Sequence, residues 1–438
     1  MEKVRNTLRV TKERAILVAA TLHTSAARDD LAELTALAES AGAVVVDKFR
    51  QRIRKINAAL YIGTGKAEQL AERVRRFKAD VIIFDNNLSP GQIRELEKIT
   101  GVKVIDRSEL ILDIFATRAK TKQAKLQVEL AQLEYTYPRL TRMWAHLDSV
   151  AGVGGATAAG VVGGIGTRGP GEQQLEIDRR LVNKKITDLK RSLAHIDKQK
   201  VLEIKGRTGL FKICLVGYTN SGKSTLLNAL TDADALVEDR LFATLDTRTR
   251  KWTLVGAAVV LLSDTVGFVE NLPHQLVASF KATLEEAINA DLLLHIVDAA
   301  NPCALRQIES VDKVLAEIGC AEKPILKVLN KIDAVKTPGE LELLQTLFAD
   351  AVSVSAKKGL NLEQLNQIVH AKYKGQEILL RITVSASNSK VPSFLSAFGQ
   401  IVTQQYCDGL VIIEARLGQN QLAALERLGS EGIEIVQL

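Results

Sequence analysis

The sequence predicts an α/β protein in which a helical hairpin joins two sheets of mostly parallel strands and a small α+β domain follows. Three observations lead to this expectation. Short β-branched runs alternate with helical patterns in two separate regions, as in βαβ units. Between these regions the pattern is purely helical and is interrupted by a glycine-rich stretch. Finally, a chain of 438 residues is too long for one ordinary core.

Residues 1–112 are expected to form the first α/β domain. Ser89 followed by Pro90 is the N-cap and first-turn signal of one of its helices. The alternation of elements predicts a largely parallel sheet. The expected strands are Ala15–Ala20, Val44–Val46, Leu60–Ile62, Val81–Phe84 and Val102–Ile105, and the expected helices are Asp30–Ser40, Lys66–Phe77 and Pro90–Ile99.

Residues 113–208 are expected to form a helical hairpin that links two domains. Its first helix, Ala119–Tyr135, has an apolar face, and Pro138 ends or kinks it. Nine glycines between residues 152 and 171 predict a loop, and a strongly basic helix, Glu172–Lys200, follows. The apolar face of the first helix consists of Leu126, Leu130 and Leu133.

The positive charge of the chain is concentrated in one stretch. The net charge is +7 with a pI of about 9.1, and residues 178–212 alone hold eleven Lys and Arg against four Asp and Glu. Such a surplus suits a phosphate backbone, although a solvated helix face is the alternative. Aromatic residues make up only 4% of the chain, which argues against extensive base stacking.

The cysteine pattern and the absence of long apolar runs predict a cytoplasmic protein. The four cysteines are scattered without a CxxC pair, so we expect a reducing compartment and neither a disulfide framework nor a zinc site. Residues 1–14 lack the apolar run of a signal peptide, and no stretch provides the roughly 18–20 apolar residues of a membrane span. We also expect a monomer.

A phosphate-binding loop is the first motif of the second α/β region. Gly217–Ser224 matches GxxxxGK[ST] and lies between the apolar strand Ile213–Val216 and the helix Thr225–Leu230. In such a loop backbone N–H groups surround phosphate oxygens at the positive end of the helix dipole. Lys223 is expected to bridge the β and γ phosphates, and the hydroxyl of Ser224 is expected to bind Mg²⁺.

A second motif, Asp264-Thr-Val-Gly267, follows the apolar strand Val259–Ser263. The carboxylate of Asp264 is expected to hold the magnesium shell through water, and the N–H of Gly267 is placed to approach the γ-phosphate. A mobile threonine between the two motifs should complete the magnesium shell. Thr244, Thr247 and Thr249 all compete for that role.

A third motif, Asn330-Lys-Ile-Asp333, selects the base. It follows the apolar run Ile325–Leu329, at the end of a strand where ligands bind in doubly wound sheets. The carboxylate of Asp333 matches the two N–H groups on the Watson–Crick edge of guanine, whereas adenine would leave it unpaired at a cost of about 1–3 kcal/mol or more. Ser355-Ala-Lys357 offers a backbone N–H to the guanine carbonyl.

The motifs together predict a guanine-nucleotide domain over residues 209–375, a P-loop GTPase domain with a doubly wound, mostly parallel sheet. Residues 376–438 are expected to form the small α+β domain with two helices and three strands, Leu379–Val384, Leu410–Glu414 and Ile433–Val436. No sequence repeat is evident.

These motifs resemble the HflX family of translation-associated GTPases. Outside the GTPase domain, residues 125–140 resemble its first linker helix, residues 164–180 its glycine-rich loop and second linker helix, and residues 63–70 a short N-terminal motif. The resemblance covers about residues 15–375 and implies that the switch threonine is Thr244. One departure is the long run 151–163 before the glycine-rich loop.

The resemblance also implies a partner. Members of this family bind the large ribosomal subunit, so we expect contacts with ribosomal RNA and proteins, through the N-terminal domain and the loop 164–171. The expected function is a GTP-hydrolysing switch in ribosome splitting, recycling or rescue under stress, or in subunit biogenesis. The alternative is a regulatory GTPase whose N-terminal domain binds a non-ribosomal protein or RNA.

Phe268 stands where many GTPases carry a glutamine that orients the attacking water. A phenyl ring cannot hold water by hydrogen bonding, so we expect slow hydrolysis by the isolated protein and stimulation by a partner. The alternative is that another side chain of this chain orients the water.

Catalysis is expected of Lys223, Thr244 and Gly267, and Mg²⁺, the expected cofactor, is assigned to Ser224, Thr244 and Asp264, the last through water. The residues expected to bind GTP or GDP are Gly217, Tyr218, Thr219, Asn220, Ser221, Gly222, Lys223, Ser224, Thr225, Phe242, Ala243, Thr244, Leu245, Asp246, Asp264, Thr265, Val266, Gly267, Asn330, Lys331, Ile332, Asp333, Ser355, Ala356 and Lys357.

Overall fold

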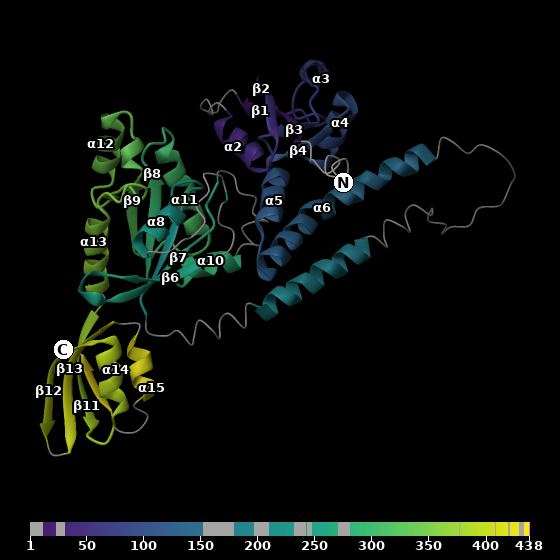
Figure 1. The fold of residues 1–438 in the computed structure, drawn as a ribbon. Helices are drawn as coiled ribbons and strands as arrows, with labels where there is room; N and C mark the ends of the chain where they lie inside the picture. The colour runs from purple at the N-terminus through teal and green to yellow at the C-terminus, as the bar shows by residue number, and fades with distance from the viewer. Residues whose placement is uncertain are drawn as a thin grey trace, which may run out of the picture. The chain divides into compact units, whose positions relative to one another are not determined.

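The structure is a computed structural model (Figure 1). The residues that it describes are 12–22, 31–151, 179–196, 210–231, 242, 248–269, 281–375, 377–407, 409–418, 421–428 and 433–437. They fall into two compact units, each described by itself. The first contains the described residues up to 194 together with Phe242, and the second contains the remaining ones.

A parallel four-stranded sheet in the order β2-β1-β3-β4 forms the centre of the N-terminal domain, as the alternation of elements predicted. One face packs on α3 and α4 through an apolar cluster that includes Ile16, Leu70 and Leu96. Helices α2 and α5 contact each other as a second pair. The elements are β1 Arg14–Leu22, α2 Ala32–Ser40, β2 Val44–Ile53, α3 Thr64–Phe77, β3 Val81–Phe84, α4 Pro90–Thr100, β4 Lys103–Asp106 and α5 Arg107–Arg118.

The predicted start of α4 is confirmed in detail. The Ser89 hydroxyl accepts a hydrogen bond from the N–H of Gln92, and the Gln92 side chain accepts one from the N–H of Ser89, which is a capping box with Pro90 in the first turn. The predicted strand Leu60–Ile62 is wrong. Leu60 and Ile62 are buried, but the backbone there forms only an isolated bridge between Asn57 and Tyr61. An apolar run reports burial and does not by itself select a strand.

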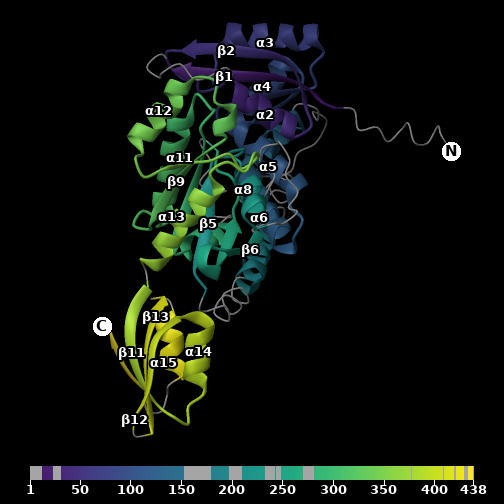
Figure 2. The same ribbon diagram turned by 60° about the vertical axis from the view of Figure 1, so that its left-hand side comes forward.

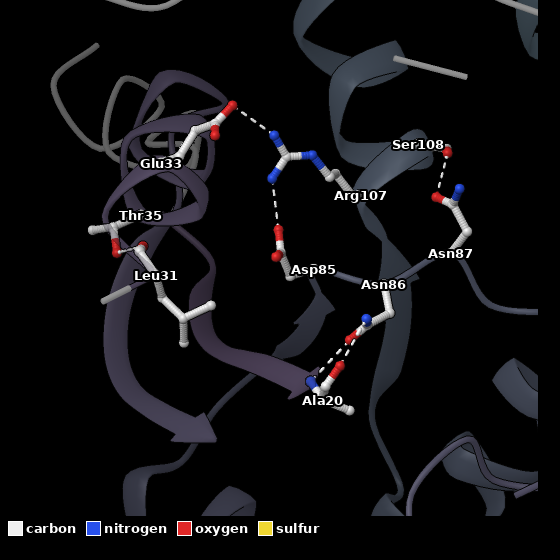
Figure 3. Close-up of polar contacts among 9 residues, drawn as sticks. All are labelled: Ala20, Leu31, Glu33, Thr35, Asp85, Asn86, Asn87, Arg107 and Ser108. Carbon is white, nitrogen blue, oxygen red and sulfur yellow. Dashed lines mark hydrogen bonds and ion pairs between the residues drawn. The ribbon is translucent and has the colours of Figure 1, made fainter. Parts of the chain in front are cut away.

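Polar side chains hold the carboxyl ends of this sheet together (Figure 3). The side-chain amide of Asn86 bonds both the N–H and the carbonyl of Ala20, which ties β3 to β1. The guanidinium of Arg107 lies 2.6 Å from a carboxylate oxygen of Asp85 and 2.6 Å from one of Glu33. Because Glu33 lies in the first turn of α2, these ion pairs fix that helix to the ends of β3 and β4.

The linker contains the two helices that the sequence predicted. The first, α6 Lys122–Ala151, continues through Pro138, so the helix does not end there. Residues 179–196 form the second helical segment. The predicted leucine face of α6 is confirmed, because Leu130 packs on Leu189 and Leu193 of the second segment, with Leu126 and Leu133 beside them.

The GTPase domain contains a six-stranded sheet in the order β10-β9-β8-β5-β7-β6, in which only β6 runs antiparallel. Helices α8 and α13 pack on one side, and α11 and α12 belong to a separate apolar cluster. Two-sided coverage confirms the doubly wound fold. The elements are β5 Lys212–Gly217, α8 Lys223–Thr231, β6 Arg248–Thr253, β7 Val259–Asp264, α10 Lys281–Ile288, β8 Leu292–Asp298, α11 Ala304–Glu317, β9 Ile325–Asn330, α12 Pro338–Leu347, β10 Val352–Ser353 and α13 Leu362–Lys374, with short 3₁₀ turns at Val255–Ala257 and Ile332–Ala334.

The C-terminal domain is an antiparallel sheet in the order β12-β13-β11-β14 with α14 and α15 packed on it (Figure 2). The chain order βαββαβ is that of the split βαβ fold. The elements are β11 Glu377–Ser385, α14 Lys390–Phe398, β12 Gln400–Cys407, β13 Leu410–Gly418, α15 Leu422–Leu428 and β14 Glu434–Gln437. The sequence did not predict β12, because its polar residues lack the alternation of a half-buried strand. No helix within the described ranges is long and apolar enough to cross a membrane.

Candidate nucleotide-binding site

The phosphate loop connects β5 to α8 and depends on two glycines. Gly217 has φ +149°, and a Cβ there would lie 2.3 Å from the carbonyl oxygen of Ile296 on β8. Gly222 has φ +92°, and a Cβ there would lie 2.3 Å from Nδ2 of Asn330. Any side chain at these positions would therefore collide with the neighbouring strand ends. The loop can follow this path only with glycine at both positions.

Lys223 lies folded into this loop and is almost fully buried. Its Nζ donates to the carbonyls of Tyr218 at 2.8 Å and Gly217 at 3.2 Å. Burial lowers the pKa of Lys223 to about 8, and the nearby carboxylate of Asp264 partly opposes this effect. An ammonium group that is held in a buried loop of glycines and backbone amides can exchange its carbonyl partners for phosphate oxygens.

The magnesium-binding residues predicted from the two motifs lie together. The hydroxyl of Ser224 donates to a carboxylate oxygen of Asp264 at 2.6 Å, and Asp264 is fully buried at the end of β7. A hydroxyl and a carboxylate are oxygen donors of the kind that Mg²⁺ prefers, with phosphate and water as the remaining ligands. These two residues thus fit the ion and would hold it, and when bound it neutralises charge on the β and γ phosphates.

The described residues contain no group of three or more His, Cys, Asp or Glu side chains arranged for a metal. A nucleotide site of this kind does not need one, because phosphates supply part of the shell.

Gly267 and Phe268 bring the second motif against the phosphate loop. The carbonyl of Phe268 accepts from the N–H of Thr219 at 2.7 Å, and its N–H donates to the carbonyl of Gly217 at 3.1 Å. A Cβ on Gly267 would lie 2.8 Å from Cα of Thr219 and 2.9 Å from Nζ of Lys223. The ring of Phe268 is buried and has no hydrogen-bonding atom, so it cannot orient a water molecule at the phosphates.

Asn330 connects three parts of the site. Its Nδ2 donates to the carbonyl of Ser221 at 2.9 Å, and its Oδ1 accepts from the N–H of Ala356 at 3.0 Å. This buried amide therefore couples the phosphate loop to the loop after β10. Its expected contact with the base stays a prediction. Lys331, with φ +62°, donates to Asp298 at 2.8 Å.

Asp333 is oriented by Ser355. The Ser355 hydroxyl donates to Oδ1 of Asp333 at 2.6 Å, and this bond lowers the pKa of Asp333 below its usual value. The same hydroxyl accepts from the N–H of Lys358 at 3.2 Å. The carboxylate is thus held ionised with one oxygen engaged, and it retains further acceptor positions for the N–H groups of guanine.

The switch segment is described only in part. Ala243, Thr244, Leu245 and Asp246 lie outside the described residues, so their roles stay predictions. Phe242 has φ +57° and is buried in the first unit, where its ring meets that of Phe115 on α5 with centroids 4.5 Å apart. Its expected contact with the nucleotide likewise stays a prediction.

Two residues near the motifs have roles that sequence reasoning missed. Thr249 lies on β6, and its hydroxyl is 2.8 Å from that of Ser263 on β7, so its partner is the sheet. Asp298 ends β8 and holds Lys331. Asp298 belongs to none of the motifs. The available signal for it was its place as a carboxylate at the end of an apolar strand next to the phosphate loop.

Comparisons with known proteins show the family of this chain. Residues 28–116 match the family described as "GTP-binding GTPase N-terminal", residues 118–207 its "Middle Region", and residues 212–331 the family "50S ribosome-binding GTPase". A GTPase HflX of Lacrimispora saccharolytica is 40% identical over 95% of this chain and 96% of its own, and one of Escherichia coli is 41% identical over 83% and 84%.

A crystal structure of a GTP-binding protein from Sulfolobus solfataricus in complex with GDP is 26% identical and covers 82% of this chain and 98% of its own, with a TM-score of 0.42. The sequence relatives extend over almost the whole chain and include the GTPase domain whose phosphate, magnesium and base motifs converge here. The chain belongs to the HflX family of GTPases and is a GTP hydrolase.

Proposed function

We propose that the GTP-bound protein binds the large ribosomal subunit and that GTP hydrolysis ends the contact. The cycle would serve ribosome splitting, recycling or rescue under stress, or subunit biogenesis. The observation that carries the proposal is a guanine-nucleotide site in the same chain as a linker helix that presents a row of exposed cations. The family description "50S ribosome-binding GTPase" for residues 212–331 supports the same partner.

The linker separates its charged residues into two groups. Lys185 and Lys190 pair with Glu129 and Glu134 of α6 at 2.6 and 2.8 Å, so part of their charge is neutralised within the hairpin. Arg179, Lys184 and Arg191 are also exposed on the second helical segment, and the guanidinium of Arg191 lies 3.9 Å from a carboxylate oxygen of Asp188. Such cations bind phosphate backbones by releasing counterions, independently of sequence.

The buried ring of Phe268 supports partner-stimulated hydrolysis. Because a phenyl ring has no hydrogen-bond donor or acceptor, this residue supplies no hydrogen bond to an attacking water. We infer that a partner orders the switch segments 242–250 and 267–273 and so completes the site. Ser224 and Asp264 would hold magnesium in that site, and Thr244 would join them once the switch segments are in place.

Co-sedimentation with purified large subunits tests the proposal. With a non-hydrolysable GTP analogue the protein should pellet with the subunits, and with GDP it should not. Charge reversal at Arg179, Lys184 and Arg191 should weaken this binding about tenfold or more and flatten its salt dependence.

A control variant with the same change of charge reverses three exposed lysines elsewhere, Lys313, Lys374 and Lys390. Equal losses in both variants would mean that net charge alone drives binding. An absence of pelleting in every nucleotide state would contradict the proposal.

A further inference from the structure

Among the residues that the structure describes, no strand pairs with the outer edge of β12, an edge strand of the C-terminal sheet. The sheet order ends at β12, which pairs with β13 on its inner side (Figures 1 and 2). Apart from Ile401, every residue of the strand is exposed. The strand therefore presents a row of backbone N–H and C=O groups to solvent, which is a template for another strand.

The contrast with the other edge strands in the described parts of the chain is sharp. Edge strands are normally protected by charge or by shortness. β2 carries Asp47, Lys48, Arg50 and Arg52, and β6 carries Arg248, Arg250 and Lys251, whereas β4, β10 and β14 have four residues or fewer. By comparison, β12 has eight residues and the sequence Gln-Ile-Val-Thr-Gln-Gln-Tyr-Cys, without a charge or a proline.

Two apolar side chains are exposed along this edge strand. The side chain of Tyr406 is 73% exposed and that of Val402 is 53% exposed. A β-bulge between Ile401 and Thr403 protects the beginning of the strand. The remainder, Thr403–Cys407, pairs with β13 in unbroken register, so it is regular enough to accept a partner on its outer side.

We propose that β12 pairs antiparallel with β12 of a second copy of this chain, so that two C-terminal sheets join into one. The occupant follows from the strand itself, because an antiparallel pair of identical strands is closed by a two-fold axis. Centred on Gln405, the pairing places Gln404 opposite Tyr406 and Thr403 opposite Cys407. No like charges meet anywhere in this register, which is the obstacle that β2 or β6 would encounter.

Gln404 and Tyr406 already form a side-chain hydrogen bond within one copy of the chain. Nε2 of Gln404 donates to the hydroxyl of Tyr406 at 2.7 Å, which shows that the two side chains lie on the same face and match in reach. In the dimer each Tyr406 would face Gln404 of the other copy on that face.

The contact is small, since five residues of each strand pair. Interfaces well below about 1,200 Å² are weak, so we expect a dissociation constant of about 10–100 µM. The proposal concerns a surface outside the nucleotide site and does not depend on ribosome binding. It replaces the expectation of a monomer.

Sedimentation velocity of the full-length protein from about 5 to about 500 µM tests the proposal. The wild type should shift from monomer to dimer across this range. Gln405→Lys and Gln405→Glu each place two like charges across the two-fold axis, so each variant alone should dimerise about tenfold more weakly or worse. An equimolar mixture of the two should regain dimerisation, because a lysine then faces a glutamate.

Gln437→Lys is the matched control, because it makes the same substitution on β14, at the opposite edge of the same sheet, and should leave dimerisation unchanged. An unaltered circular dichroism spectrum and an unaltered thermal unfolding midpoint at low concentration show that the variants are folded. A monomeric wild type at the highest concentration would overturn the proposal. So would variants that dimerise like the wild type, or a mixture that stays monomeric.

Discussion

Replacement of Asp333 by asparagine should convert a guanine site into a xanthine site. The position of Ser355 fixes which way the new amide group should turn. Its hydroxyl donates to Oδ1 of Asp333 at 2.6 Å. In Asp333→Asn the amide oxygen should keep this bond, because the amide nitrogen cannot accept one. The NH₂ group should then point toward the base, where the second carboxylate oxygen was.

The magnitude follows from the hydrogen bonds that change. The carboxylate is expected to accept two N–H bonds from guanine, and hydrogen bonds to a charged group contribute about 1.5–3 kcal/mol each. The substitution removes one acceptor and the charge behind the other, for a loss of about 3–4 kcal/mol, or roughly 10²–10³ in the dissociation constant of GDP. Xanthine presents a carbonyl where guanine presents its amino group, so XDP should gain affinity.

Isothermal titration calorimetry with GDP and XDP measures both changes on one preparation. Asp350→Asn makes the same chemical change on an exposed loop and serves as the control. Undiminished GDP binding by Asp333→Asn would refute the assignment of this carboxylate to the base. Loss of GDP affinity without a gain for XDP would refute the orientation by Ser355.

Three further perturbations test other parts of the structure. The pKa of Lys223 is about 8 in the free protein and should rise beside phosphate, so GDP binding at pH 8 should take up about half a proton. The affinity for GDP should be constant below pH 8 and fall above it. Calorimetry in two buffers of different ionisation enthalpy measures the proton uptake, and no uptake would contradict this prediction. Gly267→Ala puts a Cβ 2.8 Å from Cα of Thr219, so the affinity for a GTP analogue should fall about tenfold or more relative to the affinity for GDP. Equal losses of affinity for the two nucleotides would count against a contact of Gly267 with the γ-phosphate. Leu193→Ala should lower the free energy of unfolding by about 2–3 kcal/mol and speed hydrogen exchange over residues 179–196, whereas Leu181→Ala should do neither, because Leu181 is 59% exposed. Equal exchange in both variants would argue against the packing of the second helical segment on the leucine face of α6.

The sequence predicted where in the fold the short motifs lie, and their roles at the site stay predictions. Gly217 and Asp264 end β5 and β7, Lys223 begins α8 and Asp333 follows β9, because a motif of a few residues fixes the local backbone. The parallel order of both α/β sheets was also predictable, because helical and β-branched patterns alternate along the chain.

Long-range contacts were not predictable in this way. The amide of Asn330 bridges Ser221 and Ala356, which lie far apart in the chain, and no local motif predicted this contact. The expected place of Asn330 at the base stays a prediction. The edge strand β12 lacks an apolar face, since one edge and much of its surface meet solvent, and periodicity therefore gave no signal. At Leu60–Ile62 a strand was predicted where none exists, because a buried apolar run in a turn resembles one in a strand.

Steady-state GTP hydrolysis with and without purified large ribosomal subunits tests the central claim most directly, with Lys223→Ala as the blank. We expect slow hydrolysis by the protein alone and stimulation of about tenfold or more by the subunits, because a partner must complete a site in which the ring of Phe268 cannot orient water. An unchanged rate, together with no co-sedimentation, would contradict ribosome-stimulated hydrolysis and leave a GTPase with a different partner.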